Sequence, residues 1–214
     1  MRKDVVKLVS ACRTCIQCKD NKGQHSNQQI PEPNGCRNKL CIDIASMPVS
    51  TCGNSCFLQM IDADTKFAAT IALPNQLAES IRDALWPKWF AYFGIPASIL
   101  SDQGPNIDGK IIRQLCDQLH IKKLHSSPYH PEGNGSTERS IGSIKSVLRA
   151  MCQSRGVDIR DWDTLLDEAT LAYNSTTNKS ASFSPFKSML GTEAVLPIDR
   201  ALGTAPQGQN LIPC

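Results

Sequence analysis

The chain has 214 residues, of which 41% are hydrophobic and 20% are charged, and its formal net charge is +3. This length suits one packed domain of about 130–170 residues with short appendages, and the composition excludes wholesale disorder. The first 20 residues hold no apolar run of signal-peptide length and no stretch of about 18 apolar residues occurs, so we expect an intracellular protein that does not enter a membrane.

The N-terminal part of the chain differs from the rest. Residues 1–19 read as a short helix followed by cysteines, and residues 20–38 are polar with Gly, Asn, Gln and Pro, which is typical of a linker. The packed core should therefore begin near Lys39. The ten cysteines of an intracellular chain should be reduced, as core residues or metal ligands.

Three apolar runs open the core, at residues 40–45, 56–62 and 67–73. Turn-type residues separate them, which predicts a trio of antiparallel strands. Apolar residues at helical spacing over 75–93 then predict a helix that Pro87 kinks and that ends at Gly94.

After this helix, strands and helices alternate. We expect a strand at 98–101, a helix at 107–119, a strand at 121–124, a loop at 126–135, a long helix from about Asn134 and another helix at 162–173. Strands first, and then strand and helix in alternation, predict an α/β domain with a mixed sheet.

Three carboxylates stand on different expected elements. Asp43 lies inside the first strand, Asp102 directly after the fourth, and Glu138 in the first turn of the long helix. Two divalent cations clamped around one scissile phosphate need several carboxylates that converge from separate elements. The three acids are therefore candidate metal ligands.

Each acid also has a purely structural interpretation. Asp102 would serve as a turn residue, and Glu138 as a charge at a helix N-terminus. Asp43 resists this explanation, because an acid within an apolar strand is costly to bury unless it is paired or binds a metal. Three rival acids end a strand, occupy a turn or cap a helix and rank below the chosen set: Asp62, Asp64 and Asp108.

Basic residues are concentrated in the first 23 residues and in a run after Glu138 that comprises Arg139, Lys145, Arg149, Arg155 and Arg160. Any single charge is explained by a solvated face. Two basic runs that flank a carboxylate site fit a polyanionic partner better.

The spacing of 35 residues between Asp102 and Glu138, with the sequence around them, resembles the D,D-35-E core of retroviral and long-terminal-repeat retrotransposon integrases, particularly the gypsy-type branch. The resemblance covers residues 1 to about 199. The segments that carry it are Met1–Val5, Cys12–Cys15, Ile99–Gly104 with Asn106, Ser127–Pro131, Gly133–Gly135 with Glu138 and Arg139, Ala172–Asn174, and Phe183–Phe186.

This resemblance implies a ribonuclease-H-like fold, with a five-stranded mixed sheet flanked by helices. It implies that Asp43, Asp102 and Glu138 are catalytic and hold two Mg²⁺ or Mn²⁺ ions. The implied reaction is polynucleotidyl transfer, in which the ends of element DNA are processed at the 3′ side and joined to target DNA. The implied setting is nuclear, with a Pol polyprotein as the source, DNA as the partner and a homo-oligomer as the working form.

The resemblance further assigns DNA contacts and domains. Residues implied to contact DNA are Asn106, Tyr129, His130, Asn134, Arg139, Lys145 and Arg149, although Tyr129 is equally explained as a packing aromatic. Residues 1–19 would be the remnant of an N-terminal zinc-binding domain, 20–38 a linker, 39–199 the catalytic core and 200–214 a tail.

Cys12 and Cys15 match the second half of the family's His-His-Cys-Cys zinc site, and the histidine half is absent from the sequence. Two ligands leave a tetrahedral Zn²⁺ site incomplete. Cys18 and His25 could complete an improvised site; the alternative is an unligated pair of thiols in a fragment.

Departures from the family pattern leave the three acids intact. They are the Ile-Ala-Ser-Met that follows Asp43, and Ile107, Glu132 and Asn178. One alternative is a truncated or domesticated relic that binds DNA or a protein partner without catalysis, favoured by the missing ends of the chain. A cut-and-paste transposase of the same fold would share the acids but not Ser127–Pro131 or Phe183–Phe186. The intact acids favour an active integrase.

Overall fold

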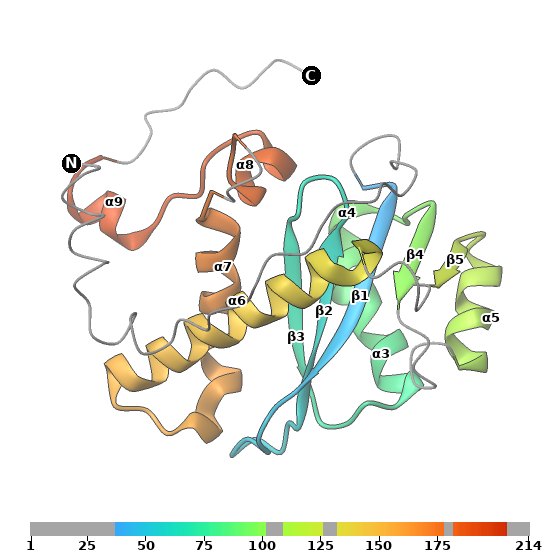
Figure 1. The fold of residues 1–214 in the computed structure, drawn as a ribbon, viewed down its shortest axis with the longest axis horizontal. Helices are drawn as coiled ribbons and strands as arrows, with labels where there is room; N and C mark the ends of the chain where they lie inside the picture. The colour runs from blue at the N-terminus through green and yellow to red at the C-terminus, as the bar shows by residue number, and fades with distance from the viewer. Residues whose placement is uncertain (1–36, 102–108, 126–131, 178–181, 205–214) are drawn as a thin grey trace.

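A computed structural model describes residues 37–101, 109–125, 132–177 and 182–204 (Figure 1). One five-stranded sheet has the order β3-β2-β1-β4-β5. Its strands are β1 (Lys39–Ser46), β2 (Cys56–Asp62), β3 (Ala68–Leu73), β4 (Ser98–Ser101) and β5 (Lys122–His125). β1 to β3 are antiparallel neighbours, while β4 and β5 run parallel to β1. The predicted strand trio and mixed sheet are confirmed, and β1 is the central strand.

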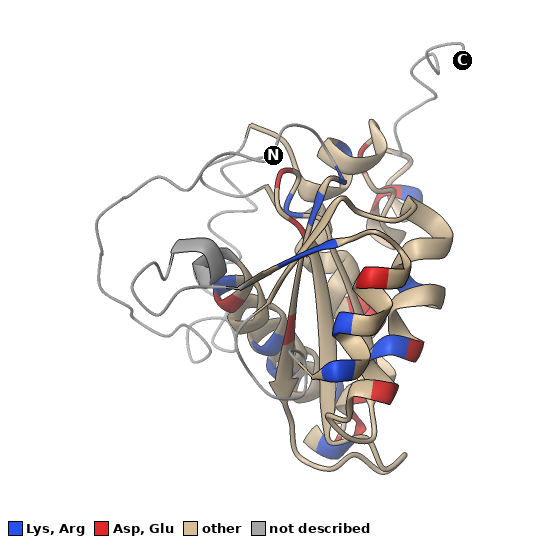
Figure 2. Cartoon of the chain, turned by 90° about the vertical axis from the view of Figure 1, so that its right-hand side faces the viewer, with Lys and Arg blue, Asp and Glu red and all other residues tan. Residues whose placement is uncertain are grey.

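Helices cover both faces of the sheet, which Figure 2 shows nearly edge-on. The helical segments are α3 (Ala78–Leu85), η1 (Trp86–Phe90), α4 (Ala91–Phe93), α5 (Lys110–Gln118), α6 (Glu132–Arg155), η2 (Ile159–Leu165), α7 (Leu166–Ser175), α8 (Pro185–Leu190) and α9 (Pro197–Ala201). Within the described residues, no helix has the length and apolar character needed to cross a bilayer.

The irregularity predicted at Pro87 is present as a π-helical turn, η1, between α3 and α4. Proline has no N–H to donate, so the helix widens locally instead of completing its regular hydrogen bonds. Gly94 ends the helical run with φ of 80°, a conformation that glycine adopts without strain. The predicted helix over 162–173 begins earlier, as the 3-10 segment η2, and continues as α7.

The long helix α6 begins at Glu132, so the predicted loop extending to residue 135 is wrong. Gly133 and Gly135 each make a helix less stable by about 1 kcal/mol relative to alanine at the same position. Adding this first turn to the helix formed by the later residues of α6, however, needs no new nucleation. Glu138 consequently lies in the second turn of α6, not in the first.

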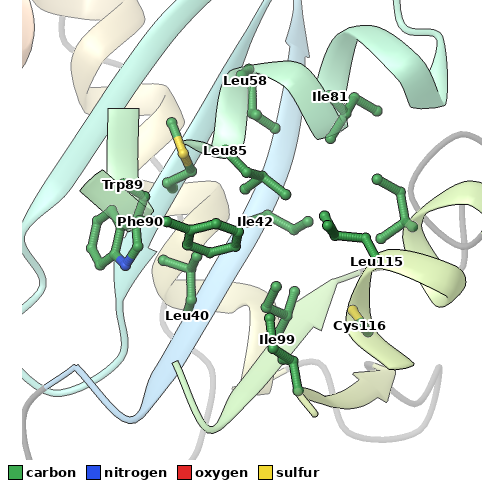
Figure 3. Packing of buried hydrophobic residues seen from close by; sticks show 14 of the residues in the cluster. Leu40, Ile42, Leu58, Ile81, Leu85, Trp89, Phe90, Ile99, Leu115 and Cys116 are labelled. Carbon is green, nitrogen blue, oxygen red and sulfur yellow. The ribbon is translucent and has the colours of Figure 1, made fainter. Parts of the chain in front are cut away.

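One face of the sheet packs against α3, η1 and α5 through apolar side chains (Figure 3). Alternate strand residues supply this cluster, because neighbouring side chains of a strand point to opposite faces. The central members from the sheet are Leu40, Ile42, Leu58, Met60 and Ile99, and the helices contribute Ile81, Leu85, Trp89, Ile112 and Leu115.

The opposite face packs against α6, η2 and α7, with α6 lying across the strands in Figure 1. Here the sheet supplies Cys41, Ala45, Phe57, Ile61 and Leu100, and the helices supply Ile144, Leu148, Trp162, Leu166 and Ala169. Four cysteines of the described residues are buried core residues, namely Cys41, Cys56, Cys116 and Cys152, whereas Cys52 is exposed and does not belong to the core. Burial raises the pKa of each of the four buried thiols.

Candidate active site

Asp43 lies on the face of the sheet that α6 covers. In β1, Leu40 and Ile42 belong to the apolar cluster beneath α3 and α5, whereas Cys41 and Ala45 belong to the cluster beneath α6 and α7. Side chains alternate along a strand, so Asp43 shares the face of Cys41 and Ala45. It is half-buried, and its Oδ1 accepts a hydrogen bond of 2.7 Å from the backbone N–H of Ile44.

Asp43 is one end of a polar row that crosses three strands. Its partner in the β1–β2 ladder is Gln59, and the partner of Gln59 in the β2–β3 ladder is Thr70. Directly opposed residues of antiparallel strands share a face, so all three side chains point toward α6 and α7. The rows on either side are apolar: Cys41, Ile61 and Ala68 on one, and Ala45, Phe57 and Ala72 on the other.

A hydrogen-bond relay joins this row to α6. Gln59 Nε2 donates to Ser140 Oγ at 2.5 Å, and Ser140 Oγ donates to the carbonyl oxygen of Thr137 at 2.7 Å. Thr137 and Ser140 are buried against the sheet, whereas Glu138 between them is exposed. The relay thus holds one turn of α6, the turn that carries Glu138, over β2. β2 is the strand that pairs with the strand of Asp43.

A second relay of the same kind joins the row to α7. The hydroxyls of Thr70 and Thr170 lie 2.6 Å apart, and Thr170 Oγ1 donates to the carbonyl oxygen of Leu166 at 2.8 Å. The single proton of Thr170 is thereby used, so the hydroxyl of Thr70 is the donor between the two threonines. The sequence analysis missed Gln59, Thr70 and both relays. A signal was available, because Gln59 and Thr70 are polar side chains within apolar runs.

Lys145 ties α6 to the sheet a second time. Its Nζ donates at 2.9 Å to the carbonyl oxygen of Ser46, the last residue of β1. Burial lowers the pKa of Lys145, the nearby Arg149 lowers it further, and Asp43 raises it, so Lys145 lies within electrostatic reach of the candidate acid. Arg139 and Arg149 are exposed on the same helix.

Several predicted site residues fall outside the described residues: Cys12, Cys15, Asp102, Asn106, Tyr129 and His130. Asn134 belongs to α6, but its side chain is also outside the description. Within the described parts of the chain, no three His, Cys, Asp or Glu side chains gather as metal ligands do. Of the three predicted acids, the structure therefore places Asp43 and Glu138.

The rival Asp62 has a structural role at the turn between β2 and β3. It is fully buried, and its carboxylate accepts hydrogen bonds from the backbone N–H groups of Arg37, Asp64 and Thr65 and from the hydroxyl of Thr65. Such bonds satisfy a buried carboxylate without a metal. Ranking Asp62 below Asp43 as a candidate ligand agrees with these contacts.

Comparison with known families decides which kind of domain this is. Residues 33–131 match the family model described as the integrase core domain. This match supports an integrase catalytic core in this part of the chain. The matched range contains the whole sheet, with Asp43 and Asp102, and it ends just before α6 and Glu138.

Curated relatives are polyproteins of retroelements. The chain is 26% identical to the retrovirus-related Pol polyprotein from transposon 412 of Drosophila melanogaster, over 92% of its own length and 16% of that protein. It is 28% identical to the Pro-Pol polyprotein of feline foamy virus, over 92% of its length and 17% of that protein. The chain thus spans about a sixth of the length of these relatives.

Solved structures that resemble the fold are retroviral integrases. The simian T-cell lymphotropic virus intasome in complex with PP2A regulatory subunit B56 gamma has a TM-score of 0.66 at 15% identity, covering 100% of this chain and 73% of that one. The catalytic core domain of BIV integrase has a TM-score of 0.58 at 18% identity, covering 72% of this chain and 95% of that one. The predicted ribonuclease-H-like fold is confirmed; the narrower assignment to the gypsy-type branch stays a prediction.

Proposed function

We propose that this integrase core is the catalytic domain of a retroelement integrase, a polynucleotidyl transferase that processes the 3′ ends of element DNA and joins them to target DNA. The observation that carries the proposal is the position of Asp43 on the central strand, facing the helix that bears Glu138. Two acids thereby belong to separate elements that pack against each other, one on the sheet and one on the helix that covers it.

The third acid would be Asp102. In the parallel ladder between β1 and β4, Cys41 is level with Leu100, and both residues belong to the cluster beneath α6 and α7. Asp43 and Asp102 each lie two residues further along the sequence. This equal spacing from the paired residues supports the assignment of Asp102 as the third acid.

The donor set fits Mg²⁺ or Mn²⁺, because three carboxylates offer the hard oxygen ligands that these cations prefer. When bound, the ions would supply Lewis-acid polarisation of the scissile phosphate and activation of the attacking oxygen. Asp43, Asp102 and Glu138 would hold them. The rows of side chains on both sides of Asp43 are apolar, so Asp43 is the acid that this part of the sheet offers to a cation.

Basic residues of α6 would hold the DNA. Arg139 and Arg149 are exposed on the helix that carries Glu138, and Lys145 lies between them. Cations at these positions attract phosphates and orient the strand without reading its sequence. Asn106, Tyr129, His130 and Asn134 are proposed as further DNA contacts on the strength of the resemblance alone.

The working form is proposed to be a homo-oligomer on DNA. Two of the similar solved structures support this, since one is an intasome and another is the HTLV-2 integrase core in complex with magnesium, in a trimeric form. The latter has a TM-score of 0.57 at 17% identity and covers 72% of this chain and 96% of that one.

Strand transfer by the purified full chain, with a labelled DNA end and Mg²⁺ or Mn²⁺, tests the proposal. We expect activity in the unchanged protein and a loss of at least about 1000-fold in Asp43→Asn, Asp102→Asn and Glu138→Gln, because an amide cannot replace a carboxylate at a divalent ion. Glu79→Gln is the matched control: Glu79 is an exposed acid on α3, on the other face of the sheet.

Each outcome distinguishes a different function. If Asp43→Asn and Glu138→Gln kept full activity while the DNA was still joined, the acids would not be the metal ligands. The unchanged protein could instead bind DNA, fail to bind Mn²⁺ and form no joined product. In that case the chain would be better described as a domesticated relic than as an enzyme.

A further inference from the structure

We propose that Gln59 is a positioning residue of this integrase core, which sets through Ser140 where Glu138 stands relative to Asp43. The role of the two acids rests on the function proposed above. Gln59 itself is 0% exposed in the middle of β2, a strand in which every residue is buried. A polar amide at such a place costs free energy unless its groups are paired.

The direction of the relay follows from the number of protons available. Ser140 Oγ has one proton, which it donates to the carbonyl oxygen of Thr137. It must therefore accept from Gln59, which orients Nε2 toward the helix and leaves Oε1 without a hydrogen-bond partner among the described residues. An apolar side chain of the same size would avoid this unpaired acceptor, so the amide is a poor choice for stability alone.

The amide of Gln59 does link the positions of the two candidate acids. Gln59 lies directly opposite Asp43 in the β1–β2 ladder. The relay ends on the Thr137 carbonyl, which shares a planar peptide group with the nitrogen of Glu138. One chain of two hydrogen bonds thus connects the strand position beside one acid to the peptide that carries the other.

The bond from Lys145 to the carbonyl oxygen of Ser46 completes the arrangement. It attaches α6 to the end of β1 five residues beyond Ser140. A helix held at one point can still pivot or slide, whereas a helix held at two points keeps its axis relative to the strands. Loss of the Gln59 relay would therefore free the acid-bearing end of α6 while the Lys145 end remained attached.

The Thr70–Thr170 relay offers a matched comparison inside the same molecule. It has the same construction: a buried strand side chain, a helix hydroxyl and a helix carbonyl oxygen. It lies one strand further from Asp43 and ends on α7, which carries none of the candidate acids. Breaking it should cost stability without moving Glu138.

The test compares Gln59→Met and Ser140→Ala with Thr70→Val and Thr170→Val in the full chain. Calorimetric titration with Mn²⁺ gives the dissociation constant, and hydrogen exchange followed by mass spectrometry reports the amides of residues 137–141. We expect the first two variants to weaken Mn²⁺ binding by about 10-fold or more, as loss of a group that orients a metal ligand does. They should also exchange these amides about 10-fold faster, while both threonine variants stay within about twofold of the unchanged protein.

Mn²⁺ affinity within twofold of the unchanged protein in both Gln59→Met and Ser140→Ala, or equal weakening in the threonine variants, would overturn the positioning role. Ser140→Ala removes only one oxygen, so it decides the matter if Gln59→Met fails to fold. Failure of the proposed function has another signature: Asp43→Asn would then leave Mn²⁺ binding unchanged. Amide exchange needs no metal, so it tests whether Gln59 fixes α6 in that case too.

Discussion

The two faces of the sheet are built from the same strands but with different chemistry. Beneath α3, η1 and α5, the middle of the sheet is apolar, with Ile42 and Leu58 at its centre. Beneath α6 and α7, the middle is the row of Asp43, Gln59 and Thr70. Gln59 and Thr70 donate hydrogen bonds to the covering helices, and Asp43 is a candidate metal ligand.

This difference separates stability from positioning. Apolar side chains stabilise in proportion to the area they bury, and they tolerate small shifts of the helix above them. Hydrogen bonds between buried groups are directional, and they are lost when a helix moves by a fraction of a bond length. The face that carries the acids therefore adds directional contacts to its apolar cluster, whereas the middle of the opposite face is held by apolar contacts.

Leu58→Ala should have the largest effect on stability. Leu58 is 0% exposed in the apolar cluster, and truncating such a leucine leaves a cavity that costs about 3 kcal/mol. Urea unfolding followed by circular dichroism measures this loss. Strand transfer per folded molecule should remain within about twofold, since the cavity lies on the face away from the acids. A large loss of transfer in fully folded Leu58→Ala would contradict the separation of the two faces.

The sequence predicted the strands well, because apolar runs bounded by turn residues are local signals. The strand trio and the position of Asp43 inside its first strand follow from residues close together in the chain, whereas the central place of β1 in the sheet depends on its pairing with β4. The relay from Gln59 to Ser140 joins residues 81 positions apart. No local pattern gives the register of a helix over a strand, so this part of the site required the fold. The start of α6 was also missed, since two glycines conceal a helix that its later turns stabilise.

Asn174→Ala should destabilise the protein by about 2 kcal/mol. The side chain of Asn174 accepts from the backbone N–H of Ala68 at 2.9 Å and donates to its carbonyl oxygen at 2.8 Å. Ala68 belongs to β3, the edge strand on the side of α7, so the amide replaces the missing neighbouring strand. Truncation leaves two buried backbone groups unpaired.

Asn174→Asp gives the graded comparison for this edge, because it keeps the acceptor and loses the donor. Its unfolding free energy, measured in urea at a pH where the carboxyl is ionised, should fall by at least as much as that of the alanine variant, since a buried charge then faces a carbonyl oxygen. Equal stability of all three proteins would show that solvent, not Asn174, satisfies the edge of β3.

The smallest effect is expected at Asp163, where the connection between β1 and β2 meets η2. Burial raises the pKa of this carboxyl. Hydrogen bonds from the side chains of Ser50 and Asn54, at 2.6 and 2.7 Å, outweigh this effect, so the net pKa of Asp163 is below its usual range. A group with a lowered pKa stabilises the folded state above its unfolded pKa of about 3.9 and loses this contribution as the pH falls through the folded pKa. Asp163→Asn should therefore be less stable by about 1 kcal/mol at pH 7.

The difference in unfolding free energy between the unchanged protein and Asp163→Asn, measured in urea at pH 7 and again near pH 3, isolates this carboxyl. Other acids with lowered pKa values, such as Asp158 and Glu168, are present in both proteins and cancel. The difference should shrink as the pH falls below about 4, because protonation removes the charged acceptor. A difference independent of pH would mean that the two hydrogen bonds do not need the charge. Strand transfer by Asp163→Asn should be unaffected at neutral pH. The contacts of Asp163 with Ser50 and Asn54 hold the connection between β1 and β2, and their loss leaves the Gln59 relay intact.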